Sequence, residues 1–162
     1  MNRKLRQDTQ WIAEQAIAAV RPDEAVRRAL EHVNLSGKVY LVAVGKAAWQ
    51  RAAAAVRELE KSVYRGIVIT KYGHVMGDIP GCVCYEAGHP VPDENSFAAT
   101  EAVLAMTENL ADNDTVLFLL SGGGSALFEK PLIAPEVLQD VTRKLLSGGA
   151  GITEINTIRK RL

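Results

Sequence analysis

The segment from Thr115 to Ser125 constrains the fold of this chain more than any other. An apolar run, Thr115–Leu120, leads directly into Ser121-Gly-Gly-Gly-Ser125. Such a bulky run is typical of a strand buried on both faces, as in a parallel α/β sheet. Three glycines remove every Cβ at the strand's carboxyl end, where open α/β sheets bind their ligands. We therefore predict a loop that binds a phosphate or a carboxylate; the alternative is a tight turn between a strand and a helix.

The composition indicates an ordinary globular protein and argues against two kinds of partner. The 162 residues suit one domain, with 48% hydrophobic and 23% charged residues. Nineteen basic residues balance nineteen acidic ones, so the net charge favours neither nucleic acid nor an anionic membrane. No apolar run approaches the roughly 20 residues that span a bilayer, and no signal-peptide core follows the basic N-terminus. We expect a cytoplasmic protein with no nucleic-acid or membrane partner.

Strand and helix patterns alternate along most of the chain. Helical spacing of apolar residues predicts two packing helices, over residues 3–20 and 22–31, before the first strand. Three further strands are expected at residues 38–45, 67–70 and 82–86, with helices at 47–61, from about 96 to 110, 135–146 and 152–162. This alternation predicts an α/β fold with a mainly parallel sheet and right-handed crossovers.

A lysine follows the first predicted strand at the start of a helix. Gly45-Lys46-Ala47 adds a full positive charge to the partial charge of a helix N-terminus, an arrangement that suits an anion. The loop lacks the spacing of a Walker A motif. The alternative is a solvated lysine at the edge of a loop.

The polar loop from Ala87 to Ser96 is stiffened by Pro90 and Pro92. Such a loop can hold several polar side chains in fixed places, namely those of His89, Asp93, Glu94 and Asn95. Either Asp93 or Asn95 could instead be the N-cap of the next helix.

Three predicted strands end in polar residues that could bind a ligand, and a parallel sheet would bring these ends to one edge. They are Lys46, the segment Lys71–His74, and the loop Ser121–Ser125. Glu154, Asn156 and Arg159, in the last predicted helix, could project toward the same mouth. Alternatively, the basic residues 159–161 complement the dipole at that helix's C-terminus.

Two cysteines, Cys82 and Cys84, lie near His74 and His89 in the sequence, and all four are residue types that bind zinc. Their spacing matches none of the usual zinc patterns. We therefore predict buried free thiols and no metal site.

Four segments together resemble the glycerate 2-kinase family, the kind that carries a MOFRL domain at its C-terminus. These segments, which follow one another from Val44 almost to the last residue, are Val44–Ala47, Gly88–Ser96, Leu120–Leu127 and Glu154–Lys160. The resemblance implies a Rossmann-like, three-layer N-terminal domain whose active site lies in a cleft with a second domain. It also implies ATP-dependent phosphorylation of D-glycerate at its 2-hydroxyl, giving 2-phosphoglycerate, with Mg²⁺ and with glycerate and a nucleotide as ligands.

Carried onto this chain, the resemblance makes Lys46 the catalytic candidate, because an ammonium group neutralises phosphoryl charge during transfer. A guanidinium such as that of Arg159 suits a carboxylate or a phosphate. The residues expected to bind substrate or nucleotide are Ser121, Gly122, Gly123, Gly124, Ser125, His89, Asp93, Glu94, Glu154, Asn156 and Arg159.

Members of that family are much longer than 162 residues. We therefore expect this chain to be a truncated N-terminal domain, with a helical lead-in over residues 1–35, an α/β part over 36–162 and no MOFRL domain. We expect it to fold partly, or by associating with another copy as a homo-oligomer, and to have little kinase activity alone.

Two rival functions remain. A hydroxypyruvate reductase that uses NAD(P)H would need Gly-x-Gly-x-x-Gly after a strand and an acidic residue at the end of the next one. Ser121–Ser125 lacks that spacing, and the second predicted strand ends in Thr70-Lys71. The other rival is a non-catalytic anion-binding or assembly module.

Overall fold

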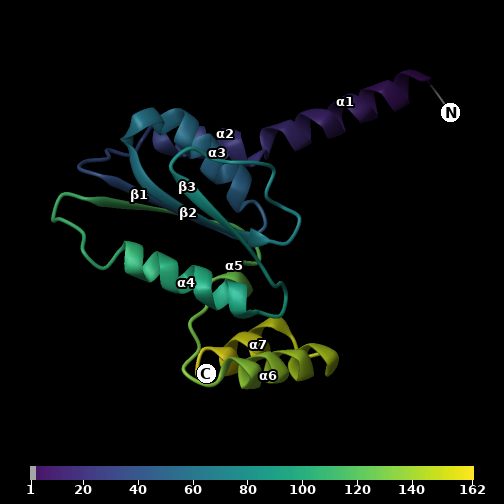
Figure 1. The fold of residues 1–162 in the computed structure, drawn as a ribbon. Coiled ribbons are helices and arrows are strands. Elements are labelled where there is room, and N and C mark those ends of the chain that lie inside the picture. The colour runs from purple at the N-terminus through teal and green to yellow at the C-terminus, as the bar shows by residue number, and fades with distance from the viewer. Residues whose placement is uncertain (1–2) are drawn as a thin grey trace.

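The computed structural model describes residues 3–162 and contains one sheet of four strands (Figure 1). The strands lie in the order β3-β2-β1-β4, and every neighbouring pair is parallel. The elements are α1 (Arg3–Ala19), α2 (Pro22–Leu30), β1 (Val39–Val44), α3 (Ala48–Leu59), η1 (Glu60–Ser62), β2 (Val63–Lys71), β3 (Cys82–Ala87), α4 (Glu94–Met106), β4 (Thr115–Leu120), α5 (Gly124–Leu127), α6 (Pro135–Ser147) and α7 (Ile152–Arg159). The predicted α/β fold with a parallel sheet is confirmed.

Helices cover both faces of the sheet, which gives the fold three layers (Figure 1). On one face, the buried alanines of α3 pack against Leu41 and Val68. On the other face, Ala99 and Val103 of α4 pack against Val42 and neighbouring strand residues. Small side chains let α3 approach the sheet closely, and its first turn lies beside the carboxyl end of β1 because the helix begins shortly after that strand.

The strand β4 is less buried than its sequence predicts. Its residues alternate between half-buried and exposed, with Val116, Phe118 and Leu120 exposed by 38%, 43% and 59%. The prediction of a strand buried on both faces is therefore wrong. In the sheet formed by the described residues, β4 is an edge strand, and one of its faces is incompletely covered.

The helices at the two ends of the chain are also less buried than expected. No described residue of α1 is buried, and Trp11, Ile12 and Ile17 are more than 60% exposed. Figure 1 shows α1 projecting from the body of the molecule. In α7, Ile155 is buried, whereas Ile152 and Ile158 are exposed. The last helix ends at Arg159 rather than at the final residue.

Candidate functional site

The loops that follow β1 and β4 are bonded to each other at the carboxyl edge of the sheet. Val44 and Leu120 are paired, so both loops begin at the same level. The backbone N–H of Lys46 donates to the Gly122 carbonyl at 2.9 Å, and that of Ala47 donates to Ser121 Oγ at 3.1 Å. The position of Lys46 is thus fixed by the glycine loop.

Gly123 is the point at which three predicted site segments meet. A Cβ added to Gly123 would lie 2.8 Å from His89 Nε2 and 3.2 Å from Lys46 Cε. Both side chains therefore lie against the bare backbone of this glycine. Within residues 121–125 only Gly123 has a positive φ, 88°, a conformation that favours glycine.

The other two glycines of the loop differ in their surroundings. A Cβ on Gly124 would lie 2.6 Å from Leu120 Cδ1, so that position requires a small residue for packing. A Cβ on Gly122 would meet nothing within 4 Å. Close approach therefore explains Gly123 and Gly124, and nothing in the structure explains Gly122.

Positive charge gathers around His89. Burial lowers the pKa of its imidazole, and the charges of Lys46 and Lys71 lower it further. The peptide bond between His89 and Pro90 is cis. A neutral imidazole leaves Lys46 as the cationic side chain that lies against Gly123.

Asp93 has a structural role at the start of α4. Its carboxylate accepts a hydrogen bond from the Ser96 N–H in a capping box, and Tyr72 Oη donates to Asp93 Oδ2 at 2.6 Å. Burial opposes ionisation, but hydrogen bonds from Tyr72, Gly88 and Ser96 outweigh it and lower the pKa of Asp93. The alternative that Asp93 is an N-cap is confirmed.

Glu94 lies beside this cap, at a small hollow of about 280 Å³. Tyr72, Asp93, Asn95 and Gln139 line the rest of the hollow. Asn95 Nδ2 donates to Tyr72 Oη at 2.9 Å. Four polar side chains and one tyrosine thus surround a space next to the His89 loop.

The predicted residues of α7 are engaged with the protein itself. Glu154 Oε2 accepts from the Gly151 N–H at 2.8 Å and so caps its own helix, while Asn156 is half-buried. Arg159 pairs with Glu129, and its Nη2 donates to the Ser125 carbonyl at 2.9 Å. Arg159 therefore joins α7 to the end of the glycine loop.

Further residues support this edge, and of these only His74 lies in a segment expected from the sequence to carry ligand-binding candidates. Arg51 Nη1 donates to the Leu120 carbonyl at 2.6 Å. His74 Nδ1 lies 2.9 Å from the Lys46 carbonyl, and Glu86 Oε1 accepts from the backbone N–H of His74 at 2.9 Å. The polar segment Lys71–His74 was a usable signal for His74, whereas Arg51 resembles any other charge on an amphipathic helix.

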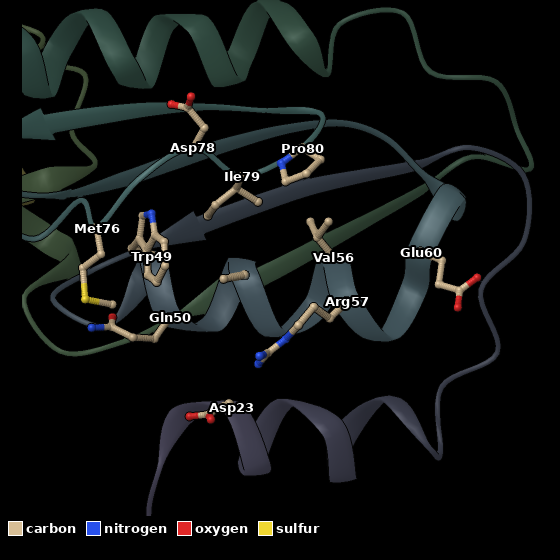
Figure 2. Close-up of a pocket in the computed structure, with 11 residues that line it drawn as sticks. Asp23, Trp49, Gln50, Val56, Arg57, Glu60, Met76, Asp78, Ile79 and Pro80 are labelled. Carbon is tan, nitrogen blue, oxygen red and sulfur yellow. The ribbon is translucent and has the colours of Figure 1, made fainter.

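A larger groove than the hollow beside Glu94 lies elsewhere in the structure. It has a volume of about 810 Å³ and runs along α3, with Trp49 and Met76 near one end and Glu60 at the other (Figure 2). It shares no residue with the group around Gly123. We place the candidate site at the strand ends, because a lysine and bare loop backbone there suit an anion.

The two cysteines are free but less buried than predicted. Cys82 and Cys84 are half-buried free thiols, and burial raises the pKa of Cys82 to about 11. Among residues 3–162, no three His, Cys, Asp or Glu side chains gather as a metal-binding group. The helices in that range include none that is long and apolar enough to cross a membrane.

Comparison with known proteins gives relatives of known or assigned activity. The chain is 54% identical over 153 residues to a D-glycerate 2-kinase from Thermotoga maritima, covering 93% of this chain and 36% of the relative. It is 39% identical over 162 residues to a putative hydroxypyruvate reductase from Agrobacterium vitis, covering 97% and 36%. The chain therefore spans little more than a third of the length of these curated relatives.

The fold has a solved counterpart. A crystal structure of glycerate kinase from Thermotoga maritima matches with a TM-score of 0.91 at 52% identity, covering 99% of this chain and 39% of that one. The predicted resemblance to glycerate 2-kinases is thus confirmed for the part of those proteins that this chain covers. Residues 8–162 also match a family profile, and the chain belongs to that family, described as a domain of unknown function (DUF4147).

Proposed function

We propose that the natural protein carrying this chain is a glycerate 2-kinase. It would transfer the γ-phosphoryl group of ATP to the 2-hydroxyl of D-glycerate, releasing ADP and a proton, and this chain would supply an anion-binding side of the site. The observation that carries the proposal is the meeting of Lys46, His89 and Gly123 at the carboxyl edge of a parallel sheet. The kinase names of several relatives support it.

The chemistry of phosphoryl transfer fits these residues. The transferred group passes through a loose transition state, so catalysis is mostly positioning and electrostatic stabilisation. The Lys46 ammonium would neutralise charge on the phosphoryl oxygens, while the bare backbone of Ser121–Ser125 lets an anion approach closely. The phosphoryl group can pass directly from ATP to glycerate, so no residue of this chain has to form a covalent intermediate.

The nucleotide and its metal ion place different demands on the chain. The lysine and the glycine loop suit phosphate oxygens or a carboxylate. Mg²⁺ usually keeps several waters and is held by one or two carboxylates plus substrate phosphates. We propose that Mg²⁺ enters with ATP, held largely by the phosphate oxygens of the nucleotide. The protein would use the nucleotide pool of the cytoplasm.

The remaining predicted residues would shape the walls of the site. Glu94, with Asp93 and Asn95, lines the polar hollow beside the His89 loop, which we propose borders the substrate. Glu154 and Asn156 would form part of the wall contributed by α7. Asp93 would act there indirectly, since its carboxylate already caps α4.

The test of this function is a coupled ADP-release assay on the natural protein in its full length. D- and L-glycerate are supplied separately with ATP and Mg²⁺, and the position of the new phosphate is determined by ³¹P and ¹H NMR. We expect turnover with D-glycerate and phosphate on the 2-hydroxyl. If the protein oxidises NADH with hydroxypyruvate and releases no ADP, the proposed function would be that of a reductase and not of a kinase.

The role of Lys46 has its own test. We expect Lys46→Ala to lower kcat by about 100-fold or more, the usual effect of removing one electrostatic contact to a transition state. Lys144→Ala is the matched control, because that lysine pairs with Asp140 on exposed α6. Equal turnover in the two variants would remove Lys46 from the catalytic site.

The ligand of the glycine loop can be identified with a further variant. Gly123→Ala would place a methyl group against His89 and Lys46. A higher KM for ATP alone would place nucleotide phosphate at the loop, and a higher KM for glycerate alone would place the carboxylate there. Unchanged KM values for both would contradict an anion-binding role for the loop.

A further inference from the structure

The glycine loop extends from an edge strand, so its position depends on contacts beyond the sheet. We propose that Arg51 and Arg159 are positioning residues that hold the two ends of the loop Ser121–Ser125 by donating to backbone carbonyls on either side of the glycines. Arg51 binds the Leu120 carbonyl, and Arg159 binds the Ser125 carbonyl. The kinetic part of this inference rests on the proposed kinase function, whereas its structural part does not.

Arg51 links the start of the loop to α3, a helix that packs against the sheet. Its Nη1 lies 2.6 Å from the Leu120 oxygen. The helix that carries it, α3, is anchored against the sheet by Ala48, Ala52 and Ala55, all fully buried. A hydrogen bond from a charged donor is about twice as strong as a neutral one. The last residue of an exposed strand is thereby tied to the core.

Arg159 links the end of the loop to two helices. Its side chain is 8% exposed and pairs with Glu129, which is 16% exposed. The backbone N–H of Glu129 in turn donates to Thr100 Oγ1 at 2.9 Å, and Thr100 is buried in α4. The Ser125 carbonyl is therefore connected through Arg159 to α7, and through the chain at Glu129 to α4.

The burial of Arg159 argues for positioning rather than for direct contact with a ligand. Its guanidinium has little exposed surface and is already bound to Glu129 and to the Ser125 carbonyl. Removing Glu129 alone would leave a nearly buried guanidinium uncompensated, which is strongly destabilising. Glu129 thus keeps Arg159 in place, and Arg159 keeps Ser125 in place.

The experiment is hydrogen exchange by mass spectrometry on the full-length natural protein without ligand, comparing Arg51→Met and Arg159→Met with wild type. In each variant we expect exchange in peptides covering residues 121–127 to be about tenfold faster, because one charge-assisted hydrogen bond is lost. Arg57→Met is the matched control, since Arg57 lies on α3 but lines the groove of Figure 2. We expect that control to exchange as wild type does.

A double variant separates positioning from general stability. Replacing a buried ion pair by apolar residues of similar volume often restores stability, although removal of one partner does not. Glu129→Leu combined with Arg159→Met should therefore unfold at nearly the wild-type temperature. Because the donor to Ser125 is still missing, loop exchange should stay about tenfold faster. Wild-type exchange in that double variant would overturn the positioning role of Arg159.

Kinetic constants distinguish a residue that positions the loop from a residue that contacts the ligand. We expect KM for the anion bound by the loop to rise about tenfold in Arg51→Met, with a smaller change in kcat, and Arg51→Lys to restore most of it. A raised KM with wild-type exchange would overturn the proposal, because the arginines would then contact the ligand directly. If the variants exchange faster but the wild-type protein has no kinase activity, the positioning role of the arginines stands and only the proposed function is rejected.

Discussion

The neighbouring strands β1 and β4 have similar sequences but different environments. Both are six residues long and apolar, Val39–Val44 and Thr115–Leu120. All six residues of β1 are buried, whereas β4 alternates between half-buried and exposed residues. The difference arises because β1 lies between two strands and under helices on both faces, while β4 lies at an edge of the described sheet.

This difference matters because each strand carries one part of the candidate site. Lys46 follows β1 and is held by a strand that the whole core supports. The glycine loop follows β4, where edge backbone groups and one apolar face have fewer partners. The buried strand β1 therefore leads into Lys46, whereas the less buried strand β4 leads into the glycine loop. That loop needs contacts from outside the sheet to hold its position.

Truncation of one leucine in each strand tests this difference in burial most directly. Leu41→Ala in β1 should lower the free energy of unfolding by about 2–5 kcal/mol, because Leu41 is fully buried. Leu120→Ala in β4 should cost about 1 kcal/mol or less, because Leu120 is 59% exposed. Urea titration followed by circular dichroism measures both. Equal losses would mean that the β4 face is covered in solution.

Sequence alone located the four strands but did not predict their order in the sheet. Apolar content and flanking turns located β1 and β4, because those signals depend on local sequence. Neither signal says which strand lies at an edge, since that depends on where the chain crosses the sheet. Similarly, the helical spacing of apolar residues between Leu5 and Val20 predicted α1, but spacing cannot tell whether another surface covers a helix.

A substitution in the glycine loop tests whether its backbone is under the expected constraint. Gly123→Ala should destabilise the protein by roughly 1–2 kcal/mol, because a non-glycine residue is strained at φ 88° and its methyl group meets His89. Gly122→Ala is the control and should be neutral within about 0.5 kcal/mol, since a Cβ there meets nothing within 4 Å. Thermal unfolding of both variants provides the comparison. Equal losses of stability in the two variants would show that the loop backbone can accommodate a side chain at Gly123.

Part of the site was predictable for a simple geometric reason. The carboxyl ends of parallel strands meet at one edge, so Lys46 and Ser121–Ser125 were expected to be neighbours. The contacts of Arg51 and Glu129 could not be predicted, because they join segments 69 and 30 residues apart through long side chains. Nothing in a single sequence distinguishes such side chains from solvated charges.

The cap of α4 tests the support on the His89 side of the site. Asp93→Ala should cost about 1 kcal/mol at pH 7, because the Ser96 N–H loses its acceptor. The folded-state pKa of Asp93 is lowered, so its contribution is present above the ordinary pKa of 3.8 and is lost as pH falls through the folded value. Urea titrations at pH 7 and pH 3 should therefore show a gap that narrows on acidification. Glu94→Ala, the adjacent exposed carboxylate, should leave the pH 7 value within about 0.5 kcal/mol of wild type.

The smallest expected effect concerns the protonation of His89 beside Gly123. Burial and the nearby lysines lower its folded-state pKa, so the unfolded chain binds the proton more readily than the folded one. The resulting penalty is absent well above pH 6.5 and grows as pH falls from there toward the folded value. His89→Gln should therefore reduce the loss of melting temperature between pH 8 and pH 5 by on the order of 1 °C. His32→Gln, at an exposed histidine, is the control, and an equal change in both variants would contradict the contribution assigned to His89.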